Sequence, residues 1–173
     1  MGAGKSTIGP ILANTLGWDS CDLDLLIEQR LGKKIRQIFE QDGEDYFRKN
    51  ESEILIELSK KSDLVISLGG GTMANEKNLA VLKKVGTIVY LKASTDSFYK
   101  RLRYKRDRPS LGVNESEDFT KDKLVNRINQ LMAKRAKFYE QADIIIDTDD
   151  SSVGRTVDKI IKLLKEADIN NEL

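Results

Sequence analysis

Histidine is absent from the sequence, and cysteine occurs only once, as Cys21. Without histidine, the chain has no His-based acid–base catalysis and no His metal ligands. One cysteine cannot form a disulfide framework, so the chain suits a reducing compartment. No apolar run approaches the roughly 20 residues that a membrane-spanning helix needs, and no signal or transit peptide is visible. We therefore expect a cytoplasmic protein.

The sequence also has no large excess of charge of one sign. It contains 29 Lys and Arg and 28 Asp and Glu, for a formal net charge of +1. This balance gives no electrostatic argument for a nucleic acid or membrane partner. The 173 residues, 39% of them hydrophobic, are enough for one domain with a real core. We expect a monomer with a single domain over residues 1–168 and a frayed tail at 169–173.

The chain opens inside a phosphate-binding motif. Gly4, Lys5 and Ser6 match the end of the P-loop pattern G-x-x-x-x-G-K-[ST], whose first glycine and preceding strand would lie ahead of Met1. Gly4 lets the backbone approach a phosphate, Lys5 supplies a cation for the β- and γ-phosphates, and Ser6 is placed to ligate Mg²⁺. The helix expected to follow would offer its positive end to the same anion. A chance match is the alternative.

Hydrophobic patterning predicts strands that alternate with helices. The expected helices cover residues 6–16, 25–31, 35–41, 45–61, 75–85, a segment that starts at 94 or 95, 121–142 and a last one ending near 167. The expected strands lie within 18–24 and at 64–68, 87–91 and 143–147. The side chains expected on buried helix faces are Ile8, Ile11, Leu12, Leu16, Phe47, Ile54, Leu55 and Leu58. This alternation predicts an α/β protein with a parallel sheet.

Two of the expected strands end in unusual residues, at the edge of a parallel sheet where ligands gather. Asp22 is the best carboxylate for a Mg²⁺ shell, which leaves Asp24 to take or orient a hydroxyl proton. Helix capping by Asp24 is the alternative reading. Gly69, Gly70 and Gly71 can bring backbone N–H groups against a ligand, although an ordinary turn would also use glycine.

The basic residues fall into three groups. Arg48 and Glu51 are one helical turn apart, so Glu51 can hold the guanidinium for a planar carboxylate, although such pairs are more often solvated surface bridges. Arg106 and Arg108 lie in a polar segment, about 103–118, that can close as a lid over a transferring phosphoryl group or remain a charged surface loop. Arg135 is a helix residue without a local signature.

Taken in order, these motifs resemble those of the shikimate kinase family. The matching segments cover nearly all of residues 1–148 and read M-G-A-G-K-S-T, C-D-L-D, D-G-E-x-x-F-R-x-x-E, S-L-G-G-G, R-P-S-L, K-R-A-x-x-Y and D-I-I-I-D-T. The resemblance implies an α/β P-loop NTPase fold of the nucleoside-monophosphate-kinase type, with strand order 2-3-1-4-5, helices on both faces and a mobile lid. It also implies transfer of the ATP γ-phosphate to the 3-hydroxyl of shikimate, a step of aromatic amino acid biosynthesis.

The resemblance assigns a role to each candidate residue. Asp24 would be the candidate base at the accepting hydroxyl, with Lys5 and Arg108 acting on the phosphates, and Ser6 and Asp22 would hold Mg²⁺. The ATP-binding residues would be Gly2, Ala3, Gly4, Lys5, Ser6, Thr7, Arg101 and Arg108. The shikimate-binding residues would be Asp24, Arg48, Gly70, Gly71 and Arg135, around a helical segment at about 24–61. The adenine-loop match near 149–154 is weak.

The central first strand of this family has no counterpart after Met1. Its loss would separate two strands from the other two and remove about four to six apolar side chains, each worth roughly 1.5–3 kcal/mol. A loss on the order of 10 kcal/mol equals the whole net stability of a typical domain. We therefore expect the native chain to start earlier and the chain as written not to be a stable kinase. Two alternatives stay open: another small-metabolite kinase, such as a gluconate kinase relative, and an inactive truncated product.

Overall fold

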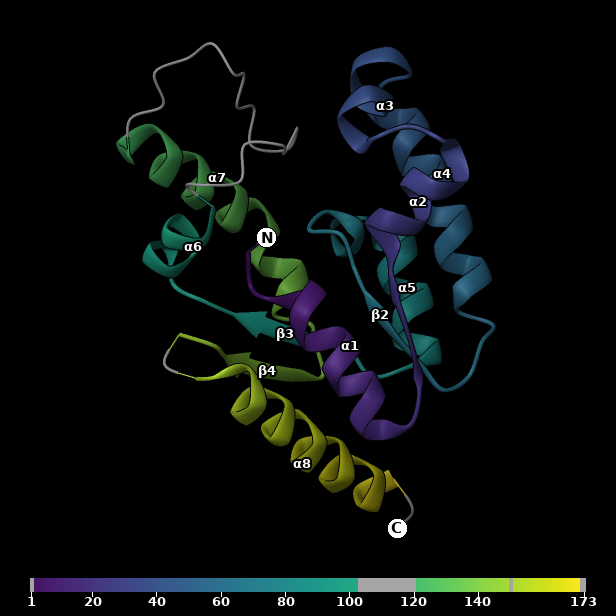
Figure 1. Cartoon of the computed structure of the whole chain (residues 1–173), viewed down its shortest axis with the longest axis vertical. Helices are drawn as coiled ribbons and strands as arrows, with labels where there is room; N and C mark the ends of the chain where they lie inside the picture. Colours follow the sequence, from purple (N-terminus) through teal and green to yellow (C-terminus); the bar gives the residue numbers. More distant parts are fainter. Residues whose placement is uncertain (1, 103–120, 150, 172–173) are drawn as a thin grey trace.

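The computed structural model describes residues 2–102, 121–149 and 151–171, and its helices and strands alternate as predicted (Figure 1). The elements, in order, are α1 (Lys5–Leu16), β1 (Asp19–Asp22), α2 (Leu23–Leu31), α3 (Ile35–Gln41), α4 (Glu44–Leu58), β2 (Leu64–Ser67), the short 3₁₀ helix η1 (Thr72–Ala74), α5 (Glu76–Val85), β3 (Val89–Lys92), α6 (Thr95–Leu102), α7 (Lys121–Tyr139), β4 (Ile144–Asp147) and α8 (Val153–Asn171). The predicted lid at about 103–118 lies outside the described residues.

The described strands form two separate parallel pairs. In one pair β1 runs beside β2, with Asp22 opposite Ser67 at the carboxyl end, and in the other β3 runs beside β4. The predicted parallel α/β fold is therefore confirmed, and so is the expected separation of two strands from the other two.

Helix α1 packs against both strand pairs (Figure 1). It contacts β1, β2 and α8, and its buried Ile8 and Leu12 join a cluster that contains Leu91 of β3 and Ile146 of β4. A second hydrophobic cluster gathers α2 to α5 and the β1–β2 pair. Because burial of apolar surface is the main driving force of folding, α1 helps to join the two strand pairs in one core.

Two polar side chains cap the starts of helices. Asn75 accepts hydrogen bonds from the N–H groups of Lys77 and Asn78 at the start of α5, and Ser94 accepts one from Ser97 at the start of α6. An N-cap side chain satisfies amides that have no partner within the helix. These caps fix where the segments after the glycine turn and after β3 become helical.

Two expectations were wrong in detail. Helix α2 begins at Leu23, so Asp24 lies in its first turn and Asp22 is the N-cap. Ile11 is 42% exposed, because the stripe of α1 that faces the core runs through Ile8 and Leu12, one full turn apart. Helix α8 continues to Asn171. By contrast, the predicted buried face of α4 (Phe47, Ile54, Leu55 and Leu58) is confirmed.

Within the described residues, no helix has both the length and the apolar character needed to cross a membrane.

Gly9 tests the contact between α1 and β2. A Cβ at Gly9 would lie 2.5 Å from the Ser67 hydroxyl, which donates to the Lys5 carbonyl. We expect Gly9→Ala to lower the free energy of unfolding by about 1–3 kcal/mol in urea denaturation, although alanine favours helices. Removing the clashing hydroxyl in the Gly9→Ala/Ser67→Ala double variant should restore part of this loss.

The matched control is Gly154→Ala in α8, where a Cβ would meet no atom within 4 Å. This control should be neutral or slightly stabilising. Equal stability of Gly9→Ala and Gly154→Ala would contradict the predicted contact.

Candidate active site

The P-loop residues form the turn that leads into α1. Gly4 is the N-cap of α1 and has φ 90°, a left-handed conformation that glycine adopts without strain. Since Gly4 has no side chain, no side-chain cap covers the first turn of the helix. The carbonyl of Lys5, the first residue of α1, accepts the hydrogen bond of Ser67 at 3.2 Å. The start of α1 is therefore held against the carboxyl end of β2.

Ser6 and Asp22, the two predicted metal ligands, lie in contact. The Ser6 hydroxyl donates to Asp22 Oδ2 at 3.1 Å, and Asp22 Oδ1 accepts the Leu25 N–H at 3.3 Å. Asp22 therefore both caps α2 and joins the P-loop helix to β1. One carboxylate oxygen caps the helix and the other accepts from Ser6, so helix capping and a role near the phosphates are compatible.

The glycine turn after β2 is in close contact with charged side chains. A Cβ at Gly69 would lie 2.6 Å from Asp24 Oδ1, 3.1 Å from Thr72 Oγ1 and 3.3 Å from Glu51 Oε1. A real Cβ does not fit at such distances, so glycine at 69 allows these side chains to converge. The glycine turn therefore lies directly against Asp24, the predicted base in the first turn of α2.

Arg48 and Glu51 form a buried ion pair and not a solvated surface bridge. The Glu51 side chain is 1% exposed, and its Oε2 accepts from Arg48 Nη1 at 2.8 Å. Its Oε1 accepts from Thr72 Oγ1 at 2.6 Å, so both carboxylate oxygens have donors. On the other edge of the guanidinium, Nε and Nη2 donate to Glu44 Oε1 at 3.2 and 3.1 Å. Burial by itself lowers the pKa of Arg48. The negative charges and hydrogen bonds of Glu51 and Glu44 more than offset this effect, so the pKa of Arg48 lies above its ordinary value.

Gly71 lies against the same guanidinium. A Cβ at Gly71 would be 2.6 Å from Arg48 Nη2 and 2.8 Å from Nη1. The Gly71 backbone has φ −106° and ψ −11°, which any residue can adopt, so the constraint at this position is the arginine and not the backbone. The structure therefore brings together Arg48 and Gly71, two of the predicted substrate-binding residues.

Arg135 reaches the glycine turn through Tyr139, a residue to which sequence reasoning gave no role. Tyr139 lies one turn after Arg135 on α7, and its hydroxyl donates to the Gly70 carbonyl. Burial raises the pKa of Tyr139, while the charge and a side-chain hydrogen bond of Arg135 act in the opposite direction. The i, i+4 spacing of Arg135 and Tyr139 was the available signal. Thr72 was also missed, and its position directly after the three glycines was the only hint.

Of the remaining predicted ATP-binding residues, three lie in or beside the P-loop and two lie far from it in the sequence. Ala3 is 5% exposed and joins the core cluster of α1, whereas Thr7 is exposed on the first turns of the helix. Gly2 has φ 63°, again in the left-handed region. Arg101 is in the last turn of α6, and Arg108 falls outside the described residues.

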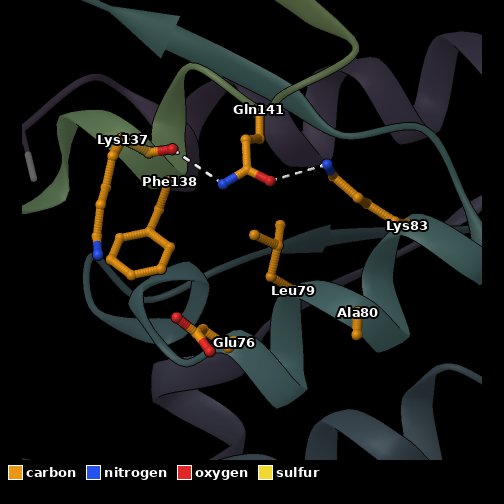
Figure 2. Close-up of a pocket in the computed structure, with 7 residues that line it drawn as sticks. All are labelled: Glu76, Leu79, Ala80, Lys83, Lys137, Phe138 and Gln141. Atoms are coloured by element: carbon orange, nitrogen blue, oxygen red, sulfur yellow. Dashed lines mark hydrogen bonds between the residues drawn. The ribbon is translucent and has the colours of Figure 1, made fainter.

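A surface pocket of about 380 Å³ lies between α5 and the end of α7, away from these contacts (Figure 2). Its lining residues are Glu76, Leu79, Ala80, Lys83, Lys137, Phe138 and Gln141. None of them is a predicted site residue. The convergence of side chains on the P-loop and the glycine turn therefore defines the candidate active site, and this pocket is separate from it.

The family model described as shikimate kinase matches residues 1–165 of the chain. The chain belongs to the shikimate kinase family. Members of this family are ATP-dependent small-molecule kinases, so the predicted enzyme class is confirmed.

Individual shikimate kinases agree with this membership. The chain is 40% identical over 164 residues to the shikimate kinase of Chlorobaculum parvum, across 95% of this chain and 88% of that protein. The crystal structure of shikimate kinase from Bacteroides thetaiotaomicron matches with a TM-score of 0.85 and 34% identity, covering 95% of this chain and 94% of that one. Shikimate kinase from Acinetobacter baumannii in complex with shikimate matches with a TM-score of 0.87 and 32% identity, covering 96% and 89% of the two chains.

Gly71 offers a direct test of the arginine site in this kinase. We expect Gly71→Ala to displace the Arg48 guanidinium and to raise the KM for the phosphoryl acceptor by at least about 10-fold, since small displacements at an active site are costly. The KM for ATP should stay within about twofold, because a change confined to acceptor binding leaves ATP binding intact. Steady-state kinetics with each substrate varied in turn would measure both values.

Gly86→Ala is the control, because Gly86 has an extended backbone and no atom within 4 Å of a Cβ. An unchanged acceptor KM in Gly71→Ala would contradict the assignment of this site to the acceptor.

Proposed function

We propose that the chain transfers the γ-phosphoryl group of ATP to the 3-hydroxyl of shikimate, through the residues that meet at the P-loop and the glycine turn. The observation that carries this proposal is the buried Arg48–Glu51 pair against Gly71, next to Asp24 at Gly69. A small alcohol with a carboxylate would match an arginine and an aspartate set side by side. The similar Acinetobacter baumannii enzyme has been solved in complex with shikimate, which supports this choice of acceptor.

On the donor side, the P-loop would bind the phosphates of ATP. The first N–H groups of an α-helix have no intrahelical acceptor, and the helix dipole favours an anion there. Gly2, Ala3, Gly4 and Thr7 would contribute backbone and hydroxyl contacts around α1, and Lys5 would place its ammonium at the β- and γ-phosphates. Arg101 and Arg108 complete the proposed ATP-binding set, on the basis of the sequence alone.

The oxygen donors at Ser6 and Asp22 suit Mg²⁺. This ion prefers hard oxygen ligands and usually takes only one or two from the protein, completing its shell with water and phosphate oxygens. A hydroxyl and a carboxylate 3.1 Å apart, next to the phosphate-binding turn, fit that pattern. When bound there, Mg²⁺ neutralises negative charge on the β- and γ-phosphates.

On the acceptor side, Arg48, Arg135 and the N–H groups of Gly70 and Gly71 would bind the carboxylate of shikimate. This would orient the 3-hydroxyl toward Asp24, which would accept or orient its proton as the oxygen attacks the γ-phosphorus. Phosphoryl transfer depends on positioning and on charge neutralisation more than on covalent catalysis by the protein. The proposed roles of Lys5 and Arg108 are of that kind.

The proposal includes a monomer in the cytoplasm. The single cysteine suits the reducing conditions of the cytoplasm, and the monomer is proposed from the sequence-based expectation alone.

A coupled ADP-release assay with ATP, Mg²⁺ and shikimate tests the function, with gluconate as the competing acceptor. It should be run on this sequence and on any longer in-frame version that the gene encodes. We expect turnover with shikimate and none with gluconate. Asp24→Asn should lower kcat by at least about 100-fold, the size of a general-base contribution, while ATP binding changes little.

Asp45→Asn, the same substitution in the first turn of α4, is the matched control for Asp24. Turnover with gluconate instead of shikimate would disprove the proposed acceptor. A kcat that is unchanged in Asp24→Asn would limit Asp24 to a structural role.

Asp22→Asn separates the metal role of Asp22 from helix capping. Asn caps helices about as well as Asp through its single side-chain oxygen, and its NH2 group can donate to the Ser6 hydroxyl oxygen, so the fold should be retained. We expect the Mg²⁺ concentration for half-maximal rate to rise by roughly 10- to 100-fold, as for other changes at metal-site partners. Magnesium titration of the initial rate measures this value.

Asp19→Asn is the control, because Asp19 is an exposed carboxylate on the same strand. An equal Mg²⁺ requirement in Asp22→Asn and Asp19→Asn would exclude Asp22 from the metal site.

A further inference from the structure

Tyr139 connects the last turn of α7 to the glycine turn that carries the acceptor-binding groups. Its side chain is 9% exposed and belongs to the core cluster of α2 to α5. The ring packs against Tyr90 of β3, with the two centroids 5.0 Å apart and the planes inclined by 31°. The ring is therefore fixed by packing, independently of what its hydroxyl does.

The Tyr139 hydroxyl has two polar neighbours, which lie on different elements. It donates its proton to the Gly70 carbonyl, and Arg135, one turn earlier on α7, is close enough to lower the pKa of the phenol. Burial raises the pKa of Tyr139 above its ordinary value despite Arg135, so the phenol keeps its proton at neutral pH and can act as the donor. The hydroxyl thus contacts the backbone of the turn, and Arg135 of the same helix acts on its pKa.

The geometry of the peptide bond extends this contact to Gly71. The described peptide bonds are all trans, so the Gly70 carbonyl and the Gly71 N–H belong to one plane and point in opposite directions. Glycine peptides turn easily, because both flanking residues have wide φ/ψ freedom. A hydrogen bond that holds the carbonyl on the Tyr139 side therefore holds the N–H on the other side. Within the described residues, that N–H donates no hydrogen bond inside the protein.

We propose that Tyr139 is a positioning residue for the acceptor carboxylate, because its hydroxyl orients the Gly70–Gly71 peptide at the turn beside which Arg135 is proposed to act. The inference rests on the proposed function, which places a carboxylate between Arg48, Arg135 and the glycine amides. Tyr139 itself touches no substrate in this arrangement. Its effect is confined to the recognition of negative charge on the acceptor.

The end of α7 is held by contacts that do not involve the Tyr139 hydroxyl. The effect of the hydroxyl can therefore be measured separately from the position of the helix. Gln141 donates to the Lys137 carbonyl at 2.9 Å and accepts from Lys83 Nζ of α5 at 3.0 Å (Figure 2). Asp143 accepts the Ile88 N–H at 2.7 Å just before β3. These contacts hold the helix end in place without the phenol hydroxyl. Replacing Tyr139 by Phe should therefore leave the helix and the ring where they are.

The test compares shikimate with its methyl ester, which keeps the hydroxyls and lacks the negative charge. For each enzyme, the ratio of kcat/KM for the acid to kcat/KM for the ester is measured. A lower fraction of folded protein would affect both substrates equally and cancels in this ratio. We expect Tyr139→Phe to raise the KM for shikimate by roughly 10-fold, the equivalent of about 1.4 kcal/mol, with kcat and the KM for ATP within about twofold.

The acid-to-ester ratio should fall by a similar factor in Tyr139→Phe and stay unchanged in Tyr90→Phe. Tyr90→Phe is the matched control, because Tyr90 supplies the other ring of the stack. An unchanged ratio in Tyr139→Phe, with wild-type protein active on shikimate, would overturn the inference and leave the proposed function intact. Wild-type protein that phosphorylates neither substrate would overturn both.

Discussion

The buried carboxylate of Glu51 is the constraint on which the acceptor side of the site depends. A carboxylate can be buried only where donors replace the water it has lost. Glu51 obtains them from Arg48 and Thr72, one on each oxygen. Removing one partner of a buried ion pair costs about 3–5 kcal/mol, because the other charge is left uncompensated. The position of Arg48 is therefore largely determined by the buried Glu51 carboxylate.

The carboxyl end of β2 places the donor and acceptor sites at a fixed separation. Ser67, its last residue, donates to the Lys5 carbonyl at the start of the P-loop helix. Gly69, two residues later, lies against Asp24, the proposed base. One strand end thus contacts both the element that would bind the phosphates and the carboxylate that would act on the hydroxyl. In the proposed function, this short covalent link would help to supply the alignment that in-line phosphoryl transfer requires.

The sequence predicted those parts of the site that lie within one element or follow a known motif. The Arg48–Glu51 pair follows from helical spacing, and the P-loop from its residue types. The contact of Ser6 with Asp22 was expected from strand ends that meet at one edge of a sheet. By contrast, the bonds of Thr72 to Glu51 and of Tyr139 to Gly70 join residues 21 and 69 positions apart. No local pattern encodes such pairs, because they depend on how helices pack across the sheet.

The charges around Arg48 explain why the proposed site needs a second arginine. Glu51 and Glu44 both face its guanidinium, so Arg48 alone brings no net positive charge to an incoming carboxylate. Glu44 is 61% exposed, and an exposed ion pair contributes only about 0–1 kcal/mol, so an acceptor can replace it at little cost. Glu51 cannot be replaced, because it is buried. In the proposed function, the uncompensated charge would therefore come from another element, and Arg135, one turn from Tyr139 on α7, is the proposed source.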